Sequence, residues 1–192
     1  MLRNNQGWKY FKPEFTLLTE DGEKELVFCK KIAPLTFILS RNKTNFEESS
    51  AFYMGKLVSN LSGSLLNLYI RMFNQISNKD EEKLICSIEY ANSYLEFSKP
   101  RFIRVYLDNY YGKKFDHSGK SYDSVKEMYE KEEDQSAISV FESRKPAYHK
   151  ETKTYSLDFY GRADISSIKN FILEDIHHRG RDYLLFGKTK QN

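Results

Sequence analysis

The side chains in this sequence that are best suited to chemistry are cations that could hold an anion. Residues 30–60 contain five basic residues against two acids, Glu47 and Glu48, which leaves a local charge of +3. The five are Lys30, Lys31, Arg41, Lys43 and Lys56. Ammonium and guanidinium groups bind phosphate through charge-assisted hydrogen bonds, and a guanidinium group can form two at once. These cations either line an anion-binding surface or form the polar outer face of an ordinary domain, which is the commoner fate of such charge.

No motif in the sequence indicates catalysis or a metal site. A glycine-rich phosphate loop and the patterns G-x-S-x-G, H-E-x-x-H and C-x-x-C are all absent. His177 and His178 are adjacent, so on a strand their rings would point to opposite faces, and we expect a surface pair in a turn. Cys86 lies in an apolar run and is expected to fill core space. We therefore expect a protein that is not an enzyme and that holds no metal and no cofactor.

Length and composition indicate a single domain. The chain has 192 residues and a net charge of +3, which is too small to indicate nucleic-acid binding, so no nucleic-acid partner is expected. No apolar run reaches the roughly 18–20 residues of a membrane-spanning helix, and the first residues lack the apolar stretch of a signal peptide. Two cysteines are too few for a disulfide scaffold, so we expect reduced thiols in a cytosolic protein.

The elements that must position the cations are mostly strands. Aromatic residues make up 15% of the chain, and they favour half-buried sheet surfaces. Strand-like runs recur at 15–19, 25–29, 35–39, 51–57, 64–70, 83–90, 101–107, 137–141, 154–159, 168–176 and 183–186. This spacing predicts an antiparallel sandwich or barrel, with a tight hairpin at Asp21-Gly22. Residues 125–134 are the exception, because their apolar residues recur at helical spacing and Asp123 or Ser124 can cap the helix.

Two stretches are more specific than a generic β pattern. Residues 53–63 read Y-M-G-K-L-V-S-N-L-S-G, and residues 157–171 read L-D-F-Y-G-R-A-D-I-S-S-I-K-N-F. They resemble the segment Y-x-G-K-L-x-S-N-L-x-G and the signature L-x-F-x-G-R-x-x-x-x-S-V-K-N-F of the tubby-like family, and Phe186-Gly187-Lys188 follows where that family has Q-F-G-R. The match is colinear from about residue 13 to 188. We therefore expect an N-terminal extension (1–12), a tubby-like domain (13–188) that is incomplete at both ends, and a C-terminal tail (189–192).

The resemblance implies a fold. Tubby-like domains form a closed β-barrel threaded by a central apolar helix, so we expect a mainly β protein, an antiparallel tubby-like β-barrel with short surface helices. In that family a first strand precedes the region of Pro13, and a further strand and the central helix follow the Phe-Gly-Arg segment. The sequence given stops at Asn192, so the first strand and the central plug helix are expected to be missing. An incomplete sequence, a partner that supplies the filler and a smaller or open barrel all stay open as explanations.

The resemblance also implies a ligand, the headgroup of phosphatidylinositol bisphosphate. The family's phosphate pocket uses a lysine and an arginine two residues apart on one strand, and these positions hold Lys56 and Val58 here. A further pocket arginine falls near Glu81 and a pocket asparagine near Thr36. Each basic residue near an anionic membrane is worth about 1 kcal/mol, so we expect these changes to weaken binding by roughly 2–3 kcal/mol. Neighbouring cations could compensate. The expected lipid-binding residues are Lys56, Arg41 and Lys43.

Two hypotheses of function follow. The first is a phosphoinositide-binding adaptor that attaches cargo peripherally to membranes, in the cytoplasm or at the cilium, with a weakened lipid site around Lys56. The second is a structural or scaffolding subunit of a ciliary or cytoskeletal (microtubule-associated) assembly, in which the lipid site has decayed and protein partners dominate. The 14 tyrosines favour the second hypothesis, because tyrosine is enriched at protein interfaces.

Overall fold

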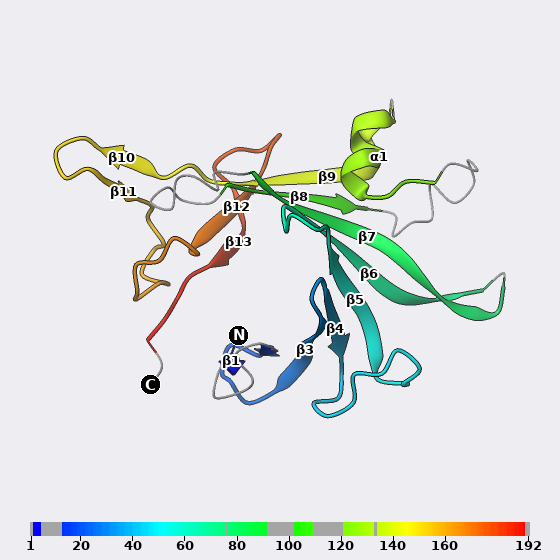
Figure 1. Ribbon diagram of the computed structural model, residues 1–192. Helices are drawn as coiled ribbons and strands as arrows, with labels where there is room; N and C mark the ends of the chain where they lie inside the picture. The colour runs from blue at the N-terminus through cyan, green and yellow to red at the C-terminus, as the bar shows by residue number, and fades with distance from the viewer. Residues whose placement is uncertain are drawn as a thin grey trace.

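The computed structural model describes residues 2–4, 13–75, 77–91, 102–109, 121–132 and 134–190. The strands are β1 (Leu2–Asn4), β2 (Glu14–Leu18), β3 (Glu25–Ala33), β4 (Thr36–Ser40), β5 (Tyr53–Ser59), β6 (Leu65–Asn74), β7 (Lys79–Ala91), β8 (Phe102–Asp108), β9 (Ile138–Ser143), β10 (Ala147–His149), β11 (Thr154–Ser156), β12 (Phe171–Asp175) and β13 (Asp182–Phe186). Eleven of them form one antiparallel sheet in chain order, whereas β10 and β11 form a separate hairpin. The sheet is strongly curved, and its edge strands β1 and β13 come to the same side of the molecule (Figure 1).

The mainly β, antiparallel architecture predicted from the sequence is confirmed. The helix α1 (Val125–Lys131) begins after Ser124, whose side chain accepts a hydrogen bond from the backbone N–H of Glu127. The Asp21-Gly22 turn joins β2 to β3, and Gly22 has a φ of +77°, which glycine adopts at no steric cost. Two short strands, β1 and β10, are not evident in the sequence. The first of them lies inside the segment 1–12 and pairs with β2.

The strands described do not close into a barrel. In the main sheet β13 pairs with β12 and β1 pairs with β2, and no ladder between described residues joins these two edges. The closed barrel that the resemblance implies is therefore replaced, in the described part of the chain, by an open curved sheet. The described residues hold no helix long and apolar enough to cross a membrane.

One face of the sheet carries both α1 and Lys56. Residues directly opposite each other in an antiparallel pair share a face, and the register of β5 with β6 pairs Lys56 with Tyr69 and Val58 with Asn67. The Asn67 side-chain amide donates a 2.7 Å hydrogen bond to the backbone carbonyl of Asp123, just before α1. We call this surface the α1 face. It lies on the outside of the curve, and the inner face lies on the other side (Figure 1).

The packed core lies beneath α1. Its buried members come from α1, β8, β9 and the turn before β9, and they are Tyr106, Val125, Met128, Ala137, Ile138 and Val140. The inner face is covered only in part. The inner-face residues of β6 are half-buried rather than buried: Leu66, Leu68, Ile70 and Met72. On the same face Leu17 of β2 is 47% exposed. Apolar burial is therefore concentrated on the α1 face, the same face that carries Lys56.

Candidate anion-binding site

Lys56 lies in β5 beside a glycine that lets two strands approach closely. A Cβ atom on Gly55 would stand 2.1 Å from the carbonyl oxygen of Tyr69 in β6, so a larger residue does not fit without moving the strand. The Lys56 side chain is 24% exposed, and its Nζ lies 2.8 Å from a carboxylate oxygen of Glu82 and 3.6 Å from one of Glu48. Glu82 belongs to β7, and Glu48 belongs to the loop between β4 and β5. The ammonium group is thus already bound by two carboxylates.

A second cation, Arg71 of β6, completes this group. Arg71 is opposite Glu82 in the register of β6 with β7, and its guanidinium carbon stands 4.5 Å from the centre of the Tyr53 ring, a cation–π contact. The guanidinium group also donates hydrogen bonds to the backbone carbonyls of Ser50 and Glu48. Buried Tyr53 donates its hydroxyl hydrogen to Glu82. We call these residues the Lys56 cluster: Lys56, Arg71, Glu48, Glu82 and Tyr53.

The Lys56 cluster is electrically balanced, because its two cations face two carboxylates. The hydrogen bond to Glu82 raises the pKa of Lys56, although burial works against this. Burial favours protonation of Glu82, but hydrogen bonds from Lys56 and Tyr53, together with the nearby positive charges, lower its pKa overall. Lys56 and Glu82 are therefore both charged at neutral pH. An arrangement of this kind can exchange a carboxylate for another anion.

A second charged cluster lies between β8, β9 and β12. Glu142 accepts hydrogen bonds from Arg104 and Arg179, and Glu174 accepts one from Arg144 at 3.2 Å. Both glutamates are buried. Burial favours protonation of Glu142, but the hydrogen bonds from Arg179 and Arg104 lower its pKa overall. Because each of these arginines already holds a buried carboxylate, we assign the cluster to strand cohesion rather than to ligand binding.

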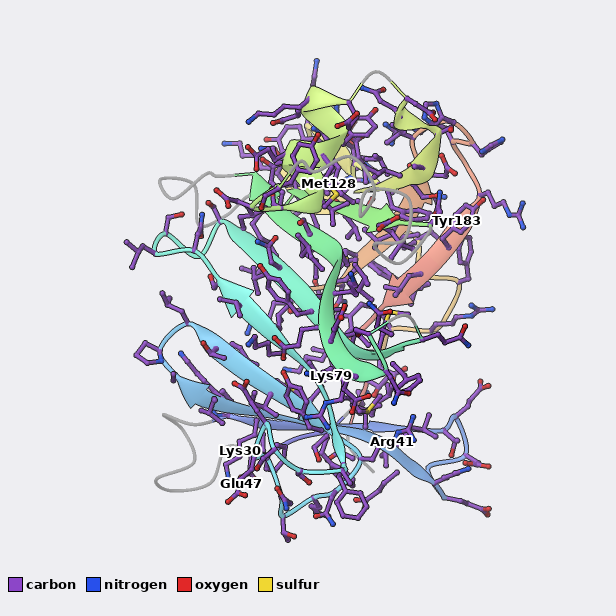
Figure 2. The ribbon with its side chains drawn as sticks, turned by 90° about the vertical axis from the view of Figure 1, so that its right-hand side faces the viewer. Lys30, Arg41, Glu47, Lys79, Met128 and Tyr183 are labelled. Carbon is purple, nitrogen blue, oxygen red and sulfur yellow. The ribbon has the colours of Figure 1, made fainter. Side chains whose placement is uncertain are left out.

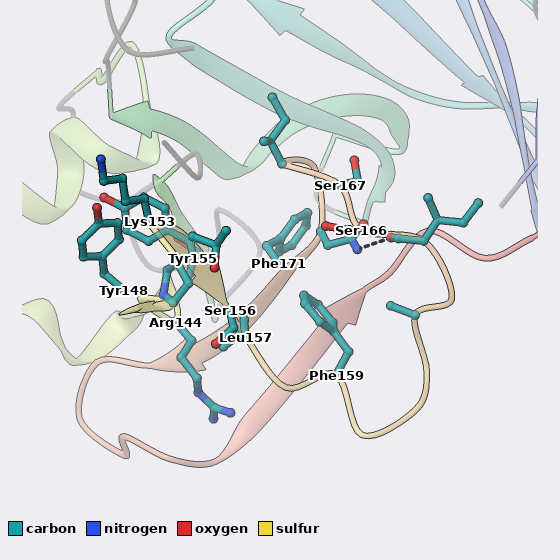
Figure 3. A pocket seen from close by; sticks show the side chains of 17 residues that line it. Arg144, Tyr148, Lys153, Tyr155, Ser156, Leu157, Phe159, Ser166, Ser167 and Phe171 are labelled. Atoms are coloured by element: carbon teal, nitrogen blue, oxygen red, sulfur yellow. Dashed lines mark hydrogen bonds between the residues drawn. The ribbon is translucent and has the colours of Figure 1, made fainter. Parts of the chain in front are cut away.

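A cavity of about 800 Å³ lies between the β10–β11 hairpin, the segment 157–170 and the start of β12 (Figure 3). Aromatic rings, serine and threonine hydroxyls and the side chain of Lys153 line it, and its lining contains no carboxylate. The side chain of Arg144 extends away from the other lining groups (Figure 3) and binds Glu174 and Asp182. The cavity therefore lacks this guanidinium group as a binding partner. Among the described residues, Lys153 is then the one cation left in the lining, whereas the Lys56 cluster brings two cations together, so we take the Lys56 cluster as the stronger candidate for holding an anion.

The whole chain matches one protein family, since a sequence profile described as the Tub family covers residues 1–192. The chain belongs to the Tub family. It is 23% identical to human Tubby-related protein 3 over 197 residues, which cover 92% of this chain and 43% of that protein. It is 27% identical to Protein king tubby 1 of Aedes aegypti, with coverage of 94% and 46%. For Tubby protein homolog 1 of Caenorhabditis briggsae the identity is 25%, with coverage of 85% and 41%.

The chain thus spans less than half the length of these curated relatives. The resemblance to the tubby-like family that the two motifs indicate is confirmed. Tub family proteins are non-enzymatic, in agreement with the absence of catalytic motifs from the sequence.

The structure does not gather the three lipid-binding residues expected for a tubby-like site. Lys43 forms a 3.0 Å ion pair with Glu25 at the start of β3, away from the Lys56 cluster. Arg41 follows β4, and Figure 2 shows it well apart from Glu47, which precedes Glu48 in the loop. Among the described ion pairs, neither Arg41 nor Lys43 joins the Lys56 cluster. The second cation of the Lys56 cluster is Arg71.

The positions where the chain departs from the tubby-like pattern lie on different faces. Val58 shares the α1 face with Lys56, as strand alternation requires. Glu81 lies opposite Met72 and therefore on the inner face, whereas the next residue, Glu82, meets Lys56. Sequence reasoning misses four members of the Lys56 cluster, Arg71, Glu82, Glu48 and Tyr53; Arg71 and Glu82 are revealed only by the pairing of β5, β6 and β7.

Proposed function

We propose that this chain is a non-enzymatic module that binds the headgroup of a phosphatidylinositol bisphosphate weakly, through the Lys56 cluster. It acts as a peripheral membrane adaptor in the cytoplasm or at a cilium. The observation that carries the proposal is the pairing of two cations, Lys56 and Arg71, around carboxylates that a phosphate can replace. Membership in the Tub family supports the same ligand.

Arg71 supplies the guanidinium group that the proposed phosphate site needs. Position 58, where the tubby-like pattern has an arginine, holds valine, but Arg71 supplies a guanidinium group from the neighbouring strand on the same face. A guanidinium group can bind two phosphate oxygens at once, and an ammonium group can bind a third. The balanced charge of the Lys56 cluster makes the affinity low, since the headgroup must compete with Glu48 and Glu82.

Co-sedimentation with vesicles tests the proposal. The wild-type chain is expected to pellet with phosphatidylcholine vesicles that contain phosphatidylinositol bisphosphate, and not with phosphatidylcholine alone. Lys56→Gln and Arg71→Gln should each weaken binding about fivefold, the effect of about 1 kcal/mol per basic residue. Lys150→Gln, which removes the same charge from the exposed β10–β11 turn, serves as the control. Failure of the wild type and of every variant to pellet with the bisphosphate lipid would contradict the proposal.

A second candidate function is a scaffolding subunit of a ciliary or cytoskeletal assembly with a decayed lipid site. The neutral charge of the Lys56 cluster and the exposure of Leu17 on the inner face favour it, because exposed apolar surface is typical of interaction sites. Purification of the full chain from its native source in lipid-free buffer, followed by light scattering, distinguishes the two. A stable complex of defined stoichiometry supports scaffolding, and a monomer that binds the lipid excludes it.

The domain limits belong to the proposal as well. A tubby-like domain at 13–188, with an extension at 1–12 and a tail at 189–192, predicts early proteolytic loss of the two ends. Residues 2–4 pair with β2. If they resist proteolysis, the N-terminal limit of the domain lies at the first residues rather than at residue 13. The tubby-like β-barrel is likewise a proposal that rests on the family resemblance; the described strands themselves form an open sheet.

A further inference from the structure

We propose that Glu48 and Glu82 serve as an internal anion that closes the Lys56 cluster and selects for ligands of high negative charge. This inference rests on the proposed function, because it concerns the regulation of the same site. Both carboxylates contact the Lys56 ammonium group in the free protein, at 3.6 Å and 2.8 Å. An incoming anion must therefore compete with these two carboxylates for the ammonium group.

The two carboxylates are held differently. Glu82 lies in β7, where it accepts the hydrogen bond of Tyr53 and stands opposite Arg71. Glu48 lies in the loop between β4 and β5, residues 41–52, and its side chain is 54% exposed. The longer distance and the greater exposure make Glu48 the carboxylate that leaves first. Glu82 then remains as a fixed negative charge beside the bound ligand.

The 41–52 loop is fixed in place by its own contacts. Its ends are joined by a 2.9 Å hydrogen bond from the Arg41 N–H to the Phe52 carbonyl. The hydroxyl of Ser40 donates a 2.7 Å hydrogen bond to the carbonyl of Asn45, in the middle of the loop. Arg71 binds the backbone carbonyl of Glu48 itself. The loop therefore presents the Glu48 carboxylate to Lys56 in a defined position.

Charge decides which ligand opens the site. A phosphate monoester carries a charge of about −1.5 to −2 near neutral pH, against −1 for a carboxylate. A headgroup with two such phosphates can replace the carboxylate of Glu48 and still gain attraction to Lys56 and Arg71. A lipid with a single net negative charge gains little by the same exchange. The internal anion thus excludes singly charged lipids and admits polyphosphorylated ones.

The first test removes the internal anion without changing the cations. Glu82→Gln and Glu48→Gln are compared with wild type on vesicles that contain the bisphosphate lipid and on vesicles that contain phosphatidylserine. Each variant should bind the bisphosphate vesicles about fivefold more tightly, and Glu82→Gln should also gain binding to phosphatidylserine. Glu81→Gln and Glu47→Gln are matched controls, because each removes the neighbouring carboxylate but none of the Lys56 contacts. These controls should bind as the wild type does.

The second test needs no lipid. The rate at which acetic anhydride acylates Lys56, measured by peptide mass spectrometry on the folded full chain, reports how tightly the carboxylates hold the amine. The rate should rise severalfold in Glu82→Gln, less in Glu48→Gln, and not in the two controls. Thermal unfolding confirms that each variant is folded. If Glu82→Gln is unstable, Glu48→Gln still tests the inference, because the Glu48 side chain is exposed and its substitution leaves the packing unchanged.

The outcomes separate the two proposals. An unchanged Lys56 acylation rate in both variants overturns the internal anion, whatever the vesicles show. A raised rate without binding of any variant to bisphosphate vesicles supports closure of the amine by Glu48 and Glu82 but overturns the proposed function. Lipid binding that depends on Lys56 but is equal in wild type and in both variants supports the function and overturns the internal anion.

Discussion

Truncating Val125 should destabilise the fold more than truncating the larger Leu17. Val125 is the first residue of α1 and is 0% exposed within the core beneath that helix. Leu17 lies in β2, and the registers from β2 to β5 place it on the inner face, opposite to the face of Lys56. There it is 47% exposed. Comparing the two losses in free energy of unfolding therefore shows which face of the curved sheet contributes more to stability.

The structure sets the magnitudes. Val125→Ala removes two methyl groups, and at about 0.8 kcal/mol per buried group the lost transfer free energy is roughly 1.6 kcal/mol. The cavity left behind adds to this because the strands around it relax only in part, so we expect a total of about 2–3 kcal/mol. Leu17→Ala removes three carbon atoms, but the side chain is already half in water, so its cost is about 1 kcal/mol.

Urea unfolding of the full chain, followed by far-UV circular dichroism, measures both costs. The two variants and the wild type should unfold with the same dependence on urea, so that a shift in midpoint reports stability alone. If Leu17→Ala costs as much as Val125→Ala, the inner face is as well packed as the α1 face. That result would refute the placement of the core beneath α1.

Three further predictions rest on single contacts. Gly55→Ala should lower the melting temperature by about 4–8 °C in calorimetry, because its Cβ would meet the Tyr69 carbonyl at 2.1 Å and overpacking costs about 2 kcal/mol. Gly63→Ala is the control: no atom lies near its Cβ, so its change in melting temperature reports the cost of a positive φ alone. The pKa of Glu142 is lowered in the folded state, so the ionised carboxylate stabilises the fold above the ordinary carboxyl pKa, and this stabilisation is lost as pH falls through the lowered value. In Glu142→Gln the free energy of unfolding should therefore fall less between pH 7 and pH 3 than in the wild type, as measured by urea midpoints. Burial raises the pKa of Cys86 to about 12, so its thiol should react with a disulfide reagent only in urea, and reaction in buffer would argue against its burial.

The sequence predicts the strands well because their signals are local. Ten of the eleven predicted strand-like runs overlap a strand of the main sheet, and the remaining run, 154–159, overlaps β11. The buried position of Cys86 and the exposure of His177 and His178 in the bend between β12 and β13 also agree with the prediction. The strands that escape prediction, β1 and β10, are three residues each and are defined by their partners rather than by a pattern of their own.

The site is harder to predict because it depends on strand register. A one-residue shift in register moves every side chain of a strand to the other face. Glu81 and Glu82 are neighbours in the sequence, yet only Glu82 reaches Lys56, because the register of β6 with β7 turns Glu81 to the inner face. Arg71 likewise becomes a site residue only when β6 is placed beside β5. Motif resemblance identifies Lys56, and it cannot identify the residues that neutralise it.

The position of the Lys56 cluster above buried residues decides how the site opens. Ile38 is opposite Lys56 in the register of β4 with β5, and it is fully buried. Lifting the whole 41–52 loop would expose apolar side chains such as this one, at about 1.5–3 kcal/mol for each. Rotating the exposed Glu48 side chain away breaks one partly solvated ion pair, which is worth about 0–1 kcal/mol. An extra negative charge on the ligand returns about 1 kcal/mol for each cation it meets, which exceeds the cost of the rotation. Lifting the loop costs more than the rotation, because it also breaks the Arg41–Phe52 and Ser40–Asn45 hydrogen bonds. The site therefore opens by movement of one side chain, while Arg71 keeps the backbone of the loop in place.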